Sequence, residues 1–222
     1  MASQRANPSL HMRLLTSRCL LPALLIGLAG CATSEPPTVF HTLLPEANAT
    51  VPAASPAPVA FRLARVSVPS QVDHSQWVVR TGDGVMTVLE HQRWVARLAD
   101  EWHDALSDRL GRRLGAIDIG RGSSGPRVAG EPALPVFEVQ AELHRFDSVF
   151  ASGALEQAVW SVRAPGGNAP AVVCSSTMSE SASPSYASLA AAHRAIVMRL
   201  ADAIAEVVQA LREGRSAACP AS

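Results

Sequence analysis

The chain has 222 residues, 48% of them hydrophobic, and its 19 arginines balance 19 acidic residues, so the formal net charge is zero. It contains no lysine and no cluster of basic residues, which excludes the electrostatic footprint typical of a nucleic-acid-binding protein. The composition therefore predicts a globular domain with ample apolar material for a core.

The start of the chain has the pattern of an export signal. Arg13 and Arg18 precede an apolar run at residues 19–30. Twelve residues in a helix cannot cross the ~30 Å hydrocarbon layer of a bilayer, and a basic segment before a short apolar run is typical of a signal peptide. We expect residues 1–30 to be removed on export, with Met12 as a candidate for the true translation start.

The apolar run ends in Leu28-Ala29-Gly30-Cys31, which resembles the bacterial lipobox. In that motif the cysteine thiol is diacylated and the chain is cut in front of it. The motif therefore predicts cleavage between Gly30 and Cys31, with a lipidated Cys31 as the mature N-terminus. An ordinary signal peptide with an incidental cysteine is the alternative interpretation.

The mature chain would have 192 residues and a net charge of −3, because the removed segment carries three arginines and no acidic residue. Residues 31–58 are expected to form an extended, Ala/Pro-rich lipidated tether with one short β-prone run at residues 39–44. We expect one periplasmic α/β domain over residues 59–214 and a C-terminal tail over residues 215–222. No second apolar stretch is long enough to span a membrane.

The domain is predicted to begin with three strands. Alternating apolar residues from Phe61 predict a strand that ends at Pro69. Residues 77–80 and 85–89 are expected to pair as a β-hairpin around Asp83-Gly84, a dipeptide typical of the type I′ turn.

A long amphipathic helix is predicted next, over residues 93–114, and Gly115 is expected to end it. On its solvent-facing side, residues 97 and 101 and residues 108 and 112 have the spacing of i,i+4 ion pairs. Its apolar positions are Trp94, Leu98, Trp102, Ala105, Leu106, Leu110 and Leu114.

The rest of the domain repeats the order of strands followed by a helix. Strands are expected at residues 116–119, 136–150, 155–164 and 171–180, with a loop at 120–135. Ser183 is expected to cap a final helix, with Pro184 in its first turn and Gly214 at its end. Two amphipathic helices packed on one mixed β-sheet form the simplest architecture that buries both apolar faces, so the predicted fold class is a single α/β domain.

No motif predicts catalysis or cofactor binding. Residues 120–125 satisfy G-x-G-x-x-G, but the dinucleotide motif requires a helix to begin there, and no helical period follows Pro126. No cysteine or histidine has metal-site spacing, and no G-x-S-x-G motif occurs. The sequence therefore predicts no catalytic, cofactor-binding or metal-binding residue, and it disfavours a periplasmic hydrolase.

Other polar and aromatic residues allow both a structural and a functional interpretation. We expect His193 to be a hydrogen-bonded core residue, and the serines at 175–188 to belong to a polar segment before a capped helix. The carboxylates at 100, 101, 104 and 108 are expected on a solvated face, with an acidic docking surface as the alternative. Trp94 and Trp102 are expected to anchor the first helix on the sheet, with an oligomer interface as the alternative.

Two cysteines remain after export, because Cys19 would leave with the signal peptide and Cys31 would be acylated. Cys174 and Cys219 would then lie in a compartment that permits disulfides. A bridge between them would fix the C-terminal tail to a strand. A buried thiol at Cys174 with an unpaired Cys219 is the alternative, and the sequence leaves both open.

The order of several short segments resembles a known family. The lipobox is followed by Val39-Phe40-His41-Thr42-Leu43 in place of a Tyr-Tyr-x-Leu-like strand, then by Val66-Ser67-Val68-Pro69 and Val78-Val79-Arg80. His91-Gln92-Arg93-Trp94 opens a helix with leucines at 98, 106 and 110, and a long strand pair and an amphipathic helix end the chain. In this order the mature chain is similar to the ABC-type transport auxiliary lipoproteins typified by paraquat-inducible protein C.

This resemblance implies a non-enzymatic α/β lipoprotein that needs no cofactor. It implies partnership with a mammalian-cell-entry (MCE) type periplasmic protein and an inner-membrane component in lipid transport that supports membrane integrity, and it is compatible with a homo-oligomer. Ala32 follows the lipidated cysteine where an aspartate would favour retention in the inner membrane, so we expect the periplasmic face of the outer membrane. A cell-envelope assembly or cell-wall regulatory lipoprotein without a transport role is the alternative.

Overall fold

The computed structural model describes residues 35–46, 59–120, 134–167 and 169–220. The chain divides into two units, residues 1–37 and 38–222, and only residues 35–37 of the first are described. The fold given below is that of the second unit. The predicted signal peptide, the cleavage site at Gly30 and Cys31, much of the tether and the glycine-rich loop at 121–133 lie outside the described residues.

A three-stranded sheet begins inside the segment that the sequence predicted to be the tether, residues 31–58. Its strand order is β1-β4-β3, with β1 parallel and β3 antiparallel to the central β4. The strands are β1 (Val39–His41), β3 (Gln76–Gly82) and β4 (Val85–Trp94).

A five-stranded mixed sheet has the order β5-β2-β6-β7-β8. The short strand β2 is parallel to both β5 and β6, whereas β6, β7 and β8 form an antiparallel meander. The strands are β2 (Ala60–Leu63), β5 (Ile117–Asp118), β6 (Val136–Val149), β7 (Gly153–Arg163) and β8 (Val172–Ser181).

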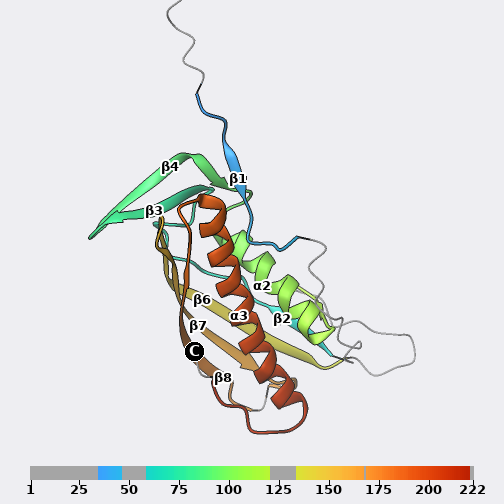
Figure 1. The fold of residues 1–222 in the computed structure, drawn as a ribbon. Coiled ribbons are helices and arrows are strands. Elements are labelled where there is room, and N and C mark those ends of the chain that lie inside the picture. Colours follow the sequence, from blue (N-terminus) through green and yellow to red (C-terminus); the bar gives the residue numbers. More distant parts are fainter. Residues whose placement is uncertain (1–34, 47–58, 121–133, 168, 221–222) are drawn as a thin grey trace, which may run out of the picture. The chain divides into compact units, whose positions relative to one another are not determined.

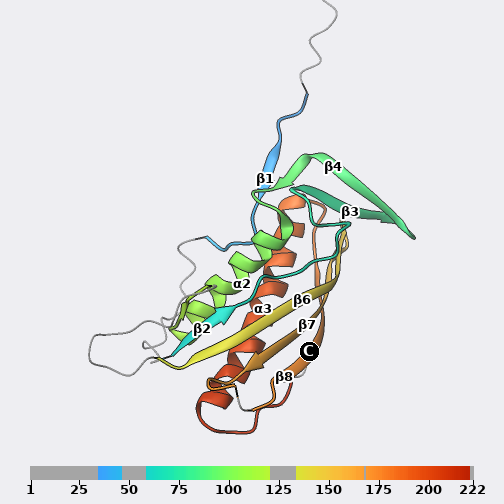
Figure 2. The same ribbon diagram turned by 180° about the vertical axis from the view of Figure 1, so that it is seen from behind.

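Two helices, α2 (Leu98–Leu114) and α3 (Tyr186–Arg212), cover one face of the five-stranded sheet. α3 packs on β6, β7 and β8, and α2 packs against α3 and β5. Figure 1 shows both helices in front of this sheet, and Figure 2, from behind, shows the opposite face without a helix. Because only one face is covered, residues along β7 alternate between buried and half-buried positions, as a one-sided sheet requires.

The core lies between the sheets and the helices and contains all four tryptophans. Trp77, Trp94, Trp102 and Trp160 are at most 1% exposed, and the rings of Trp77 and Trp94 lie 4.3 Å apart between centroids. The predicted α/β class with two long helices packed on β-sheet is confirmed, but the strands form two sheets and not the one mixed sheet that the sequence predicted. The strands divide between two sheets because β1, β3 and β4 pair only with one another among the described residues.

The predicted start of the first helix is wrong. Residues 93 and 94 end β4, and α2 begins only at Leu98, after Arg97 in an extended conformation. The reason is a parallel pairing with β1, which places Phe40 beside Arg93 and His41 beside Trp94. Trp94 and Leu98 are both buried and four residues apart, so they imitate the period of a helix.

Two local details also differ from the prediction. The β3–β4 hairpin is present, but its turn is not type I′, because that turn requires positive φ at both central residues. Gly84 has φ +66°, but Asp83 does not have positive φ, since Ala151 is the only non-glycine residue with positive φ in the described part of the chain. The cap of α3 is Ser185 rather than Ser183. Its hydroxyl accepts a hydrogen bond from the Ser188 backbone amide at 3.1 Å, so Pro184 lies before the helix.

Candidate functional site

A chain of hydrogen bonds crosses the core where β6, β7 and α3 meet. His193 on α3 lies between Ser148 on β6 and Glu156 on β7. Its Nε2 is 2.8 Å from the Ser148 Oγ and its Nδ1 is 2.8 Å from the Glu156 Oε1. The imidazole stacks on the ring of Phe146 at 3.9 Å, which fixes the plane of the ring. His193 is thus the hydrogen-bonded core histidine that the sequence predicted.

Two tryptophans extend this chain to the rest of the fold. The Trp77 indole N–H, from β3, donates to the Ser148 Oγ at 2.9 Å, and the Trp102 indole N–H, from α2, donates to the Glu156 Oε2 at 3.0 Å. The network therefore joins both sheets and both helices through five side chains. We call Trp77, Ser148, His193, Glu156 and Trp102 the core network.

The order Ser148, His193, Glu156 is that of a nucleophile, a base and an orienting acid. One proton assignment satisfies every bond: the His193 Nδ1–H donates to Glu156, and the Ser148 hydroxyl donates to the His193 Nε2 while accepting from Trp77. However, Ser148 and His193 have no exposed surface and Glu156 is 2% exposed. A substrate cannot reach this serine in the folded protein, so the network connects elements of the fold.

A second buried carboxylate holds the residues directly after β1. Glu101 of α2 is 4% exposed, and its Oε2 accepts hydrogen bonds at 2.8 Å from the Thr42 Oγ1 and from the Leu43 backbone amide. Arg194 of α3 donates to the Thr42 carbonyl at 2.9 Å. The expectation that Glu101 pairs with Arg97 on a solvated face is wrong, because Arg97 instead pairs with Asp73.

The rest of the acidic face of α2 conforms to expectation in part. Asp108 and Arg112 form the predicted i,i+4 ion pair at 2.8 Å, and Asp100 and Asp104 are exposed. Since Glu101 is turned inward, these exposed carboxylates form a sparser surface than the sequence indicated.

A third buried carboxylate lies on the uncovered face of β6. Asp147 accepts hydrogen bonds from the Arg80 Nη2 at 2.8 Å and from the Arg145 Nε at 2.5 Å. Burial raises the pKa of the Asp147 carboxyl, but the two arginines outweigh burial and hold this pKa below its usual value. The ion pair to Arg80 fastens the β3–β4 hairpin to the five-stranded sheet.

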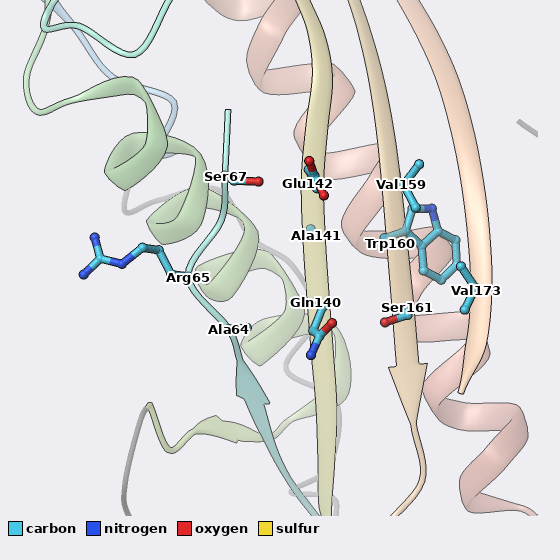
Figure 3. A pocket seen from close by; sticks show the side chains of 10 residues that line it. All are labelled: Ala64, Arg65, Ser67, Gln140, Ala141, Glu142, Val159, Trp160, Ser161 and Val173. Carbon is cyan, nitrogen blue, oxygen red and sulfur yellow. The ribbon is translucent and has the colours of Figure 1, made fainter. Parts of the chain in front are cut away.

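A hollow of about 370 Å³ lies on the uncovered face of the five-stranded sheet (Figure 3). It forms because β2 and β6 separate between the Ala64 amide, which donates to the Val139 carbonyl, and Ser67, which accepts from the Leu143 amide. Its lining is mixed: Ala64, Arg65, Ser67, Gln140, Ala141, Glu142, Val159, Trp160, Ser161 and Val173. No histidine or cysteine lines it, and this set contains no nucleophile–base pair.

Ser175 and Ser176, in the middle of β8, face opposite sides of the sheet. Ser176 is buried and its hydroxyl accepts a hydrogen bond from the Trp160 indole at 3.0 Å, while Ser175 is exposed on the other face of the strand. Among the described residues, no group of three or more histidine, cysteine or acidic side chains could hold a metal ion. Among the described helices, none is long and apolar enough to cross a membrane.

The structure places Cys174 and Cys219 together. Their Cα atoms are 5.5 Å apart and a disulfide joins the sulfur atoms. Cys174 lies on the helix-facing side of the edge strand β8, so the bond attaches the tail that follows α3 to the sheet. The other two site residues from the sequence, Gly30 and Cys31, lie outside the described residues.

The core network is the feature that sequence reasoning missed. Ser148 and Glu156 belong to no motif, and 45 residues separate Ser148 from His193. Only the strand register brings them together, since β6 and β7 pair Phe146 with Glu156 and Ser148 with Ala154. Ser148 and Glu156 could have been found by predicting the β6–β7 register and then searching the helix-facing side of these strands for polar residues.

Fold and polar contacts together define a class: an α/β domain with helices on one face of a sheet, whose buried charged groups connect its elements. Residues 41–205 match the model of the ABC-type transport auxiliary lipoprotein component family. Since this match spans most of the chain, the protein belongs to that family of auxiliary lipoproteins of ABC-type transport systems.

Solved structures share the fold. An uncharacterised protein aligns with a TM-score of 0.57 and 12% identity, covering 78% of this chain and 99% of its own. A Xanthomonas campestris protein of the DUF330 family aligns with a TM-score of 0.54 and 16% identity, covering 81% of this chain and 94% of its own. At these identities the likeness concerns the fold alone. No curated protein matches the sequence.

Proposed function

We propose that this protein is a periplasmic lipoprotein, cleaved after Gly30 and acylated at Cys31, that acts as the auxiliary subunit of an MCE-type lipid transport system between the inner and outer membranes. The observation that carries this proposal is the family match over residues 41–205. The lipobox at residues 28–31 supports the anchor, and Ala32 after the acylated cysteine supports the outer membrane as its location.

The role we propose is binding rather than catalysis. The serine–histidine–carboxylate arrangement of the core network is buried. The indole N–H groups of Trp77 and Trp102 donate hydrogen bonds to its serine and its carboxylate. A domain anchored in one membrane cannot bridge two membranes by itself. Partners must therefore supply the rest of the lipid path, and the domain contributes an anchored surface for them.

Affinity purification tests the assembly. Full-length tagged protein extracted from membranes in mild detergent should recover an MCE-type periplasmic protein and an inner-membrane transport component. Cys31→Ser is the matched variant: it should leave the folded domain unchanged but remove the acyl group, which mass spectrometry of the N-terminal peptide reports. Recovery of cell-wall enzymes without any transport component would instead support the assembly or cell-wall regulatory role.

A deletion strain tests the role in the envelope. Loss of this gene should reproduce the sensitivity to membrane-damaging agents caused by loss of the MCE-type partner, and the double deletion should be no worse than either single one. A variant with Ser148→Ala should restore resistance if it folds. The proposal is wrong if purified protein hydrolyses ester or peptide substrates and Ser148→Ala abolishes both hydrolysis and complementation without loss of stability.

A further inference from the structure

Apolar side chains are exposed where the described fold begins, on and beside strand β1. Phe40 is 61% exposed, Val39 is 44% exposed, and Val95, the residue after β4, is 63% exposed. The Val95 amide donates to the His41 carbonyl at 2.9 Å, so Val95 lies against the end of β1. Alternation along β1 places Val39 on the face of His41, opposite to Phe40. We call Phe40 and Val95 the β1 patch.

The strand register gives this patch a direction. His41 and Trp94 are paired neighbours that point into the core, where their rings lie 6.5 Å apart. Because side chains alternate along a strand, the next pair, Phe40 and Arg93, faces outward. The Arg93 Nε donates only to the Glu90 carbonyl, and no acidic side chain of the described residues forms an ion pair with Arg93. The outward surface therefore combines exposed apolar groups with an arginine whose charge has no acidic partner.

The proposed anchor restricts where this surface can be. Val39 lies eight positions after Cys31, and a fully extended chain over eight Cα–Cα steps spans at most about 29 Å. By comparison, the 27 residues of α3 are about 40 Å long. A short tether keeps its end at a high effective concentration near the bilayer. Exposed apolar residues at the other end of the domain, such as Val173, have no comparable constraint.

The patch is also attached firmly to the domain. β1 pairs along its length with β4, and the residues directly after it are held by Glu101 of α2 and Arg194 of α3. Contact of β1 with a surface would therefore orient the whole domain.

From these constraints we infer that the β1 patch rests on the lipid headgroup region of the membrane that holds the Cys31 anchor. The inference depends on the lipidation proposed above. An apolar surface beside an arginine suits the interface, where the ring enters the boundary with the acyl chains and the guanidinium reaches lipid phosphates. The outer edge of β1 has no paired strand among the described residues, and headgroup water can satisfy its backbone groups.

Quenching by brominated lipids tests this contact. Acylated full-length protein is placed in vesicles of phosphatidylethanolamine and phosphatidylglycerol, with and without bromine on the acyl chains. Phe40→Trp and Val95→Trp are compared with Val173→Trp, whose site is 62% exposed at the start of β8. The four native tryptophans are buried, so the unsubstituted protein supplies the background to subtract. Circular dichroism and thermal unfolding confirm that each variant is folded.

The inference requires that brominated lipid quenches the added emission at positions 40 and 95 but not at position 173. Equal quenching at all three positions, or none at 40 and 95 in acylated protein, would overturn it while leaving the lipidation intact. Mass spectrometry that finds no acyl group on Cys31 would instead remove the anchor on which both proposals depend. If Phe40→Ser prevents recovery of a protein partner and lipid quenches neither position, the patch binds that partner and the inference is wrong.

Discussion

At the scale of single residues, three buried carboxylates each receive two or more hydrogen bonds, at least one of them from a residue distant in the sequence. Glu156 accepts from His193 and Trp102, Glu101 accepts from Thr42 and Leu43 directly after β1, and Asp147 accepts from two arginines. Removing one partner of a buried charge lowers the free energy of unfolding by more than the intact pair adds to it. The reason is that the remaining charge stays out of water without a partner. These groups therefore make the fold sensitive to single substitutions.

Replacement of His193 tests the core network. His193→Ala would leave Glu156 with one donor, remove the acceptor of the Ser148 hydroxyl and open a cavity against Phe146. We expect the free energy of unfolding, measured in urea, to fall by about 3–5 kcal/mol. His144→Ala is the matched control: this side chain is 54% exposed and its loss should change stability by less than about 0.5 kcal/mol. Equal effects of the two substitutions would mean that the network contributes nothing.

The pH dependence of stability tests the Asp147 cluster. Because the folded protein holds the pKa of this carboxyl below its ordinary value of 3.8, ionised Asp147 stabilises the fold above that pH. The stabilisation is lost as the pH falls through the lowered pKa. Asp147→Asn should therefore destabilise the protein at pH 7, on the order of 1–3 kcal/mol.

Urea unfolding of Asp147→Asn and of the unsubstituted protein should converge once the pH is well below 4. Asp104→Asn provides the control, since this side chain is 63% exposed and should show little difference at either pH. A destabilisation by Asp147→Asn that is the same at pH 7 and in strong acid would contradict the assigned role of its charge.

At the scale of elements, α2 holds the start of the domain through one side chain. Glu101→Gln keeps the shape of the residue but replaces a charge-assisted acceptor by a neutral one, which weakens its bonds to Thr42 and Leu43. We expect faster amide hydrogen exchange over residues 39–43 in this variant, while exchange in β7 stays unchanged. Asp100→Asn, exposed one position earlier on α2, should leave both segments as they are. Unchanged exchange in Glu101→Gln would show that pairing with β4 alone holds β1.

The elements that could be predicted from the sequence are those whose signals are local. β6, β7, β8 and α3 lie within about three residues of the expected ranges, because each shows its own period and is bounded by turn or capping residues. The start of α2 could not be predicted, since Trp94 becomes a strand residue through tertiary pairing: with β1, which lies more than 50 residues earlier, and through its amide, which donates to the Ser75 carbonyl. The core network escaped for the same reason: its members come from five elements.

At the scale of the whole molecule, the end of the chain is attached to the sheet through Cys174 and Cys219. The bond closes a loop of 45 residues that contains most of β8 and all of α3. In the chain-entropy description, a cross-link of this length restricts the unfolded chain and stabilises the fold by about 4 kcal/mol, within a usual range of roughly 2–5 kcal/mol. We propose that the pair is oxidised in the mature protein, as the periplasm permits.

The last prediction concerns this bond. Non-reducing peptide mapping of protein isolated from the cell envelope should find the peptides of Cys174 and Cys219 linked, and alkylation should label neither thiol. Cys219→Ser removes the bond at its exposed end without disturbing the core, so the loss of stability it causes measures the cross-link. Cys174→Ala should cost at least as much, because Cys174 is also buried against α3. The unsubstituted protein in reducing buffer should unfold at the same urea concentration as Cys219→Ser, and that variant should not respond to the reductant. Free thiols in freshly isolated protein, or a reductant effect that persists in Cys219→Ser, would contradict the assignment.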